Sequence, residues 1–285
     1  MPGDGATPVA LDPAVFDDVA REPGSPKPDA VLAAGGVERR FGGLTAVEVD
    51  RLEIQRGAIT ALIGPNGAGK TTLFNVLTGF DAADAGEWQL NGERIDRMPA
   101  YRVAQRGMVR TFQLTKSLTK LSVIDNMKLG ATGQSGERLL QGLWRPSWIR
   151  QEREIEARAE ALLERFGLAH MRNEFAGTMS GGQRKLLEMA RALMSEPELL
   201  MLDEPMAGVN PALTQSLLAH ITALRDEGMT VVFVEHDMDV VMEISDWVVV
   251  LAEGQVIAEG PPSHVVSSPE VIDAYLGQPL DGVDP

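Results

Sequence analysis

A glycine-rich run in the first third of the chain constrains the fold more than any other feature. Residues 64–71 read Gly-Pro-Asn-Gly-Ala-Gly-Lys-Thr and match the pattern G-x-x-x-x-G-K-[ST] in full. The run follows the apolar segment Ile59–Ile63, which predicts a buried strand, and it precedes residues 71–80, which predict a helix. This order of strand, loop and helix is the context in which the pattern marks a phosphate-binding loop.

The spacing within this loop has a chemical reason. Glycines let successive backbone N–H groups turn inward around an anion, and the start of the helix adds partial positive charge. Lys70 can reach the β- and γ-phosphates of a nucleotide, and the hydroxyl of Thr71 can ligate Mg²⁺. The alternative, a glycine-rich turn beside an unrelated lysine, leaves the flanking strand and helix unexplained.

Further apolar runs predict a parallel sheet around this loop. Leu199–Leu202, Thr230–Val234 and Trp247–Leu251 are continuous apolar segments, as parallel strands covered on both faces require. Residues 248–252 and 255–258 also flank a Glu-Gly turn, which predicts a hairpin.

The remaining pattern adds two smaller parts to the sheet. Residues 31–40 and 47–55 predict an antiparallel pair of strands. Between about 115 and 195 the pattern becomes helical, and apolar residues recur on one face of Gln151–Phe166. The sequence therefore predicts an α/β fold with a parallel-sheet core, an antiparallel β edge and an inserted helical subdomain.

Two acidic residues stand where a second half of the site is expected. Asp203 and Glu204 end the strand predicted at 199–202, and ligands of such folds bind at the carboxyl ends of parallel strands. Asp203 would hold Mg²⁺, directly or through water, and Glu204 would polarise an attacking water. An isolated Asp-Glu pair is more often a helix cap or a solvated loop, but beside a complete phosphate loop that reading is the weaker one.

Composition excludes several classes of protein. The net charge of −15, from 26 basic and 41 acidic residues, argues against a nucleic-acid partner. The absence of cysteine excludes disulfides, thiolate metal sites and cysteine nucleophiles. No apolar run approaches the roughly 18 residues of a membrane-spanning helix, and the acidic N-terminal residues do not resemble a signal peptide. We therefore expect a cytoplasmic chain that reaches a membrane only through other subunits.

The two ends of the chain differ from its middle. Residues 1–30 are rich in proline and acidic residues and predict a disordered or loosely packed leader. Residues 261–285 contain acids but no Lys or Arg and predict an acidic tail with one short helix. One domain is expected over 31–260, with the helical subdomain at about 115–195.

A second motif carries a resemblance to a known family. Ser180-Gly181-Gly182-Gln183 is similar to the signature of ATP-binding-cassette (ABC) ATPases, and it precedes Leu-Asp-Glu-Pro at 202–205 in that family's order. Serine and two glycines at a helix start form a second phosphate-binding end. By resemblance, Ser180 and Gly182 would contact ATP held by the phosphate loop of a second subunit. The alternative is a serine helix cap followed by a flexible Gly-Gly turn.

The resemblance implies roles for further residues in an ATP and Mg²⁺ site. Phe41 would stack on adenine, Gln113 would contact Mg²⁺ and the attacking water, and His236 would contact the γ-phosphate. The alternatives are a buried edge-strand phenylalanine, a surface glutamine and a structural histidine. With Thr71, Gln113 and Asp203 on the metal and Glu204 and His236 in catalysis, the residues expected to contact nucleotide are Phe41, Gly64, Pro65, Asn66, Gly67, Ala68, Gly69, Lys70, Thr71, Thr72, Gln113, Ser180, Gly181, Gly182 and Gln183.

Several runs resemble one branch of the family. Phe41–Val47, Arg110–Gln113, Gly208–Pro211 and Ala274–Gly277 together resemble the ATP-binding subunit of bacterial branched-chain amino-acid importers, including related urea and amide importers. Asn210 departs from the family, in which many members have aspartate at this position, and this puts in doubt any role that needs a negative charge there.

The resemblance implies partners and leaves some questions open. The expected partners are a second ABC ATPase subunit, identical or paralogous, and transmembrane permease subunits on the inner face of the cell membrane, with a solute-binding protein acting indirectly. The alternative function is a non-transport ABC ATPase in DNA repair, chromosome structure or translation. The cargo and the role of the segment with Trp144 and Trp148, internal packing or contact with a membrane subunit, stay open.

Overall fold

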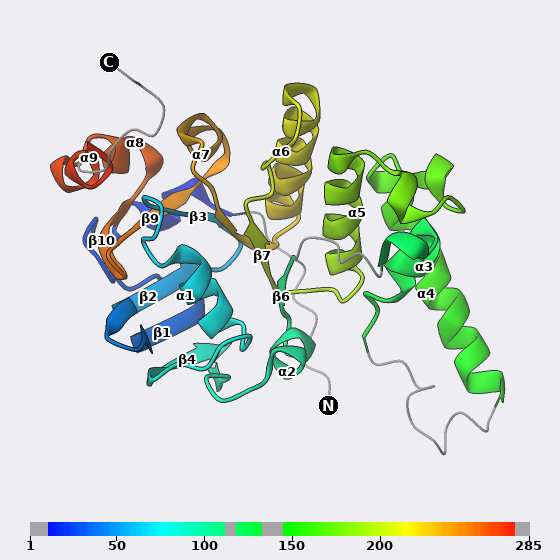
Figure 1. Ribbon diagram of the computed structural model, residues 1–285, viewed down its shortest axis with the longest axis horizontal. Helices are drawn as coiled ribbons and strands as arrows, with labels where there is room; N and C mark the ends of the chain where they lie inside the picture. Colours follow the sequence, from blue (N-terminus) through cyan, green and yellow to red (C-terminus); the bar gives the residue numbers. More distant parts are fainter. Residues whose placement is uncertain (1–10, 112–117, 133–144, 277–285) are drawn as a thin grey trace.

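The computed structural model describes residues 11–111, 118–132 and 145–276. Its centre is a six-stranded sheet in the order β10-β9-β3-β8-β7-β6 (Figure 1). All neighbouring strands in it are parallel except the β9–β10 hairpin. The strands are β3 (Ile59–Ile63), β6 (Met108–Arg110), β7 (Leu199–Asp203), β8 (Thr230–Val234), β9 (Trp247–Ala252) and β10 (Gln255–Gly260). The predicted parallel strands and hairpin are confirmed; β6, with three residues, was not predicted.

A four-stranded antiparallel sheet in the order β2-β1-β4-β5 lies beside this core. The predicted pairing of 31–40 with 47–55 is confirmed, because β1 and β2 form a hairpin through Gly42 and Gly43. The other two strands come from a segment for which no strand was predicted. The bounds are β1 (Ala30–Phe41), β2 (Leu44–Gln55), β4 (Ala85–Leu90) and β5 (Glu93–Arg94).

Helices complete the domain. The helical subdomain contains α3 (Val123–Lys128), α4 (Arg145–Arg165) and α5 (Gly181–Leu193), all within the expected range 115–195, and Figure 1 shows them to one side of the sheet. Ala159 and Leu163 of α4 are fully buried, as the one-faced apolar pattern predicted. The remaining helical elements are η1 (Pro13–Phe16), α1 (Lys70–Leu77), α2 (Ala100–Gln105), η2 (Leu118–Lys120), η4 (Ala169–Met171), η5 (Ala176–Thr178), α6 (Pro211–Asp226), α7 (Met238–Ile244), α8 (Pro262–Val266) and α9 (Pro269–Leu276).

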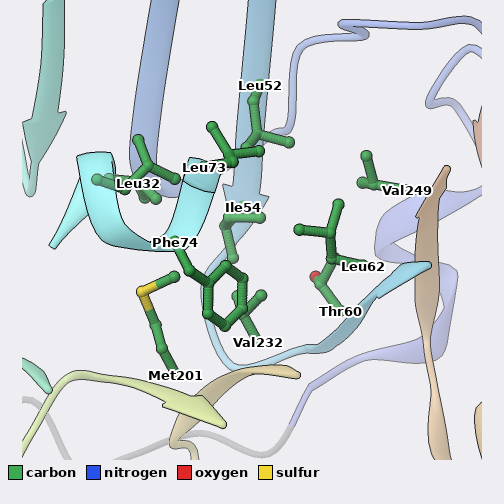
Figure 2. Close-up of a pocket in the computed structure, with 11 residues that line it drawn as sticks. Leu32, Leu52, Ile54, Thr60, Leu62, Leu73, Phe74, Met201, Val232 and Val249 are labelled. Atoms are coloured by element: carbon green, nitrogen blue, oxygen red, sulfur yellow. The ribbon is translucent and has the colours of Figure 1, made fainter. Parts of the chain in front are cut away.

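The parallel sheet separates two apolar cores. Side chains alternate along a strand, so Ile59, Ala61 and Ile63 of β3 join one core, whereas Leu62 joins the other. In the second core α1 packs between the two sheets (Figure 2). Leu73 and Phe74 of α1 meet apolar side chains from both sheets, among them Leu32, Ile54, Leu62 and Met201. This packing fixes the helix whose first turn follows the phosphate loop.

Residues 11–29 differ from the loosely packed leader that their prolines predicted. Phe16 is 9% exposed and stacks on Trp247 with 4.8 Å between ring centroids. Lys27 Nζ lies 4.6 Å from the centroid of the same ring and forms a buried ion pair with Glu259 at 3.1 Å. The composition of this segment did not reveal its packing, because a few aromatic and charged side chains, rather than a repeating pattern, hold it on β9 and β10. Residues 1–10 lie outside the described residues.

The C-terminal segment forms two short helices where one was expected. Helices α8 and α9 pack on the β9–β10 hairpin and bury Val265 and Val271. Residues 277–285 of the predicted acidic tail lie outside the described residues. No helix in the described ranges combines the length and apolar character needed to cross a membrane.

Candidate functional site

The glycine-rich run forms the loop between β3 and α1, as predicted. Gly64 and Gly69 have φ values of 150° and 98°, in the region that favours glycine. A Cβ on Gly64 would lie 1.9 Å from the carbonyl oxygen of Leu251, and one on Gly69 would lie 2.3 Å from that of Ala46. These two glycines are therefore required by close backbone contacts. Helix α1 begins at Lys70 without a side-chain cap, so its first N–H groups suit an anion.

The Lys70 side chain folds back over this loop. Its Nζ donates hydrogen bonds to the carbonyl oxygens of Gly64 at 2.6 Å and Pro65 at 2.9 Å. Burial lowers the pKa of Lys70, and the charges of Glu204 and Asp203 oppose that shift. The fold therefore brings the two acids close enough to the ammonium to act on it, although they lie far away in the sequence.

Asp203 and Glu204 stand at the end of β7 in two different environments. Asp203 is the last residue of the strand and is half-buried, and its register partner on β8 is Val234. Glu204 leaves the strand with a φ of 44°, which is uncommon for a residue with a side chain. Its N–H donates to the carbonyl oxygen of Val234 at 3.1 Å, and its carbonyl oxygen accepts from Lys185 Nζ at 3.2 Å. Backbone contacts thus hold Glu204 in this conformation.

Arg110 is a site residue for which the sequence predicted no role. It ends β6, and its guanidinium donates to Oδ2 of Asp203 and to Oδ1 of Asn75 on α1. The guanidinium also lies 5.6 Å from the ring centroid of Phe74. Arg110 therefore ties the Asp203 carboxylate to the helix that follows the phosphate loop. Its position in the Arg-Thr-Phe-Gln run was a signal, but its partners lie far away in the sequence.

The signature run begins α5. Ser180 is the helix N-cap: its Oγ accepts from the Gln183 N–H at 3.2 Å, and Gln183 Oε1 accepts from the Ser180 N–H at 2.9 Å. Gly181 faces open space, whereas a Cβ on Gly182 would lie 1.7 Å from Cδ2 of Leu213 on α6. The alternative reading as a helix cap is thus part of the structure, and Gly181 is the exposed glycine of the pair.

The signature and the phosphate loop of one chain lie on different parts of the fold. Helix α5 packs with α3 and α4, whereas α1 packs with β2. Figure 1 shows α5 well separated from α1, with β6 and β7 between them in this view. The two motifs therefore do not form one site within a single chain, which is compatible with the expectation that the signature acts on a second subunit.

Three other predicted residues have clear positions. Phe41 ends β1 with 49% exposure, so it is not a core residue, and the Arg39 guanidinium lies 4.5 Å from its ring centroid. His236 follows β8 with an exposed side chain. Asn210 caps α6, where its side chain accepts from the Leu213 N–H at 3.0 Å. Asparagine caps a helix as well as aspartate does, and the cap explains how it is accommodated.

Some predicted residues lie outside the described ones. Gln113 is within 112–117, and Trp144 is within 133–144, as is most of the segment whose role was left open. Thr71 and Thr72 lie in the first turn of α1, with Thr71 exposed and Thr72 half-buried.

Tyr275 of α9, in the Ala-Tyr-Leu-Gly run, lies beside the first residue of the phosphate loop. Its hydroxyl is buried, and the polar group beside it is the backbone of Gly64. Burial raises the pKa of Tyr275, and Gly64 opposes this shift. The C-terminal segment thus lies against the first residue of the loop.

Comparison with known proteins agrees with these features. Residues 47–207 match the family model described as ABC transporter, and residues 255–280 match that described as branched-chain amino acid ATP-binding cassette transporter. The chain is 42% identical over 250 residues to the high-affinity branched-chain amino acid transport ATP-binding protein BraF of Pseudomonas aeruginosa, covering 87% of this chain and 98% of BraF. It is 39% identical over 247 residues to a probable branched-chain amino acid transport ATP-binding protein of Archaeoglobus fulgidus, covering 87% and 95%.

Solved structures are similar over the same span. A crystal structure of a nucleotide-free ATP-binding cassette from an ABC transporter gives a TM-score of 0.77 at 36% identity, covering 87% of this chain and all of that one. A crystal structure of the ADP conformation of an ABC transporter cassette gives 0.76 at 35% identity, covering 87% and 99%. The predicted P-loop ABC ATPase fold is confirmed.

Proposed function

The chain belongs to the ABC transporter family as an ATP-binding and ATP-hydrolysing subunit, and we propose that its complex imports branched-chain amino acids. The observation that carries the cargo is the C-terminal match at 255–280 to the branched-chain amino acid cassettes. Relatives named for the same cargo, of which BraF is covered to 98%, support it. The alternative of a non-transport ABC ATPase has no comparable support.

The loop and Lys70 recognise the phosphates. The N–H groups at the start of α1 and the Lys70 ammonium would bind the β- and γ-phosphates, with Lys70 exchanging its two carbonyl partners for phosphate oxygens. Phe41, whose ring is half exposed, would stack on adenine.

Glu204 and His236 would take part directly in ATP hydrolysis. Glu204 would orient the attacking water and accept its proton, and His236 would contact the γ-phosphate. The fixed backbone of Glu204 supports this role, because a water-orienting carboxylate must hold its position during the reaction.

The donor set fits Mg²⁺. Thr71, Asp203 and Gln113 offer only oxygen ligands, as this ion prefers, and Arg110 fixes the Asp203 carboxylate through Oδ2. No group of three or more His, Asp and Glu gathers among the described residues, so phosphate oxygens and water would complete the coordination. When bound, the ion would neutralise charge that develops on the phosphates.

Two chains would complete two sites. The first turn of α5, with Gly181 exposed, would cover the γ-phosphate held by the partner's loop. The partner is a second ABC ATPase subunit, and the pair would bind permease subunits on the inner face of the cell membrane. A solute-binding protein would deliver the cargo to those permeases.

Uptake in the source cell tests the cargo. Cells that carry only the Lys70→Ala chain are expected to lose ATP-dependent uptake of radiolabelled leucine, isoleucine and valine, while urea and acetamide uptake stays at the wild-type rate. The reason is that Lys70 would bind the phosphates of ATP, so its loss should stop transport of whichever cargo this complex moves. Re-expression of the wild-type chain is the control. Loss of urea or amide uptake, with leucine uptake intact, would move the chain to the related importers and contradict the proposal.

A further inference from the structure

Glu235, the residue before His236, is a buried carboxylate to which the proposed reaction assigns no role. It follows β8 directly and is 1% exposed. Burial raises its pKa, and hydrogen bonds from the N–H groups of Met206 and His236 oppose this shift. Because a buried carboxylate is costly unless its oxygens find donors, its partners indicate why it is there.

The two carboxylate oxygens bind two different loops. Oε1 accepts from the N–H of Met206 at 3.0 Å, two residues after Glu204. Oε2 accepts from the N–H of His236 at 3.3 Å and lies 3.7 Å from Nδ1 of the same histidine. One side chain therefore connects the loop that carries Glu204 to the segment that carries His236.

This connection begins where the sheet ends. The last register pair between β7 and β8 is Asp203 with Val234, and beyond it Glu204 turns away with a positive φ. The last backbone bond between the two strands runs from the Glu204 N–H to the carbonyl oxygen of Val234 at 3.1 Å, and beyond it the Glu235 side chain makes the connection. A glutamine could still accept from Met206 through its single carbonyl oxygen, but its amide group would turn a donor toward His236.

We propose that Glu235 is a positioning residue for ATP hydrolysis, which clamps the loop after Glu204 to the backbone of the His236 segment. Because Oε2 accepts from the His236 N–H, the carboxylate holds the main chain from which the imidazole extends. The inference rests on the proposed role of His236 and adds to it the group that holds the backbone of this residue in place.

Kinetics of Glu235→Gln test the proposal. We expect kcat to fall by about tenfold to a hundredfold, which is the range for residues that position a functional side chain without contacting the substrate. The ATP affinity should change by less than about twofold. The matched control is Glu53→Gln, which alters another buried carboxylate that accepts a backbone N–H, from Lys27 at 2.7 Å. This control should lose thermal stability but keep the wild-type kcat. A wild-type kcat in Glu235→Gln overturns the proposal.

A double-mutant cycle separates a positioning role from a general structural one. In a His236→Ala background, Glu235→Gln should lower kcat by less than about a further twofold, because both changes remove the same placement of the imidazole. An equal loss in both backgrounds would mean that Glu235 does not act through His236. A wild-type kcat in His236→Ala alone would instead contradict the proposed role of His236, so the two failures are distinguishable.

Discussion

Lys70→Ala is expected to lower ATP affinity by about ten- to a hundredfold. The ammonium is half-buried beside two acids, and charge-assisted hydrogen bonds to phosphate contribute roughly 1.5–3 kcal/mol each. The variant should keep its fold, because Lys70 Nζ bonds only to carbonyl oxygens of its own loop. Equilibrium binding of a fluorescent ATP analogue, with unlabelled ATP as competitor, measures the change.

Lys120→Ala is the matched control for that experiment. Lys120 is exposed on η2, away from the phosphate loop, and its replacement should leave ATP affinity at the wild-type value. Equal affinity in wild type and Lys70→Ala would refute the assignment of residues 64–71 as the phosphate-binding loop.

Glu204→Gln is expected to keep ATP bound and slow its hydrolysis by about a hundredfold or more. The amide keeps the size of the side chain and the positive φ of the residue, but it cannot accept a proton from water. Chains with bound ATP should then accumulate as a stable dimer, because turnover no longer releases the nucleotide. Phosphate release under single-turnover conditions and light scattering with ATP measure the two effects.

The control for this variant is Glu198→Gln at the other end of the same strand. Glu198 precedes β7 and is exposed, where it pairs with Arg56 and Asn91. Its replacement should leave turnover unchanged. If Glu204→Gln also turns over at the wild-type rate, the proton acceptor lies elsewhere, and His236 is the next candidate.

The sequence predicted the parts of the fold that repeat a pattern. Continuous apolar runs identified β3, β7, β8 and β9, because strands buried on both faces need apolar residues at every position. The glycine motif also predicted the loop between β3 and α1, since a phosphate loop requires glycines at fixed spacing. Strands β4, β5 and β6 carry no such run, and tertiary contacts define them.

Contacts between distant segments could not be predicted from the sequence. The ion pair of Lys27 with Glu259, the bond of Arg110 to Asp203 and the clamp at Glu235 each join residues that no local rule connects. Gly182 illustrates the same limit. By resemblance it would contact a partner's ATP, but a side chain there would meet Leu213 first, so Gly182→Asp would test packing together with phosphate contact. Gly181, which faces open space, isolates the second effect.

We infer that a complete site needs the loop of one chain and the signature of another. Gly181→Asp would bring a carboxylate against the partner's γ-phosphate, and like charges about 4 Å apart repel by roughly 1 kcal/mol in water and more in a dry interface. Its own loop is unchanged, so it should bind ATP normally. Lys70→Ala has the opposite defect, an altered loop with an intact signature.

Size-exclusion chromatography with light scattering of these two chains, each also carrying Glu204→Gln to block turnover, tests this requirement. With ATP, each chain alone should remain a monomer, whereas an equimolar mixture should form a dimer, because the mixed pair contains one complete site. Dimerisation of the Gly181→Asp chain alone to the same extent as its Glu204→Gln parent, or a mixture that stays monomeric, would contradict it.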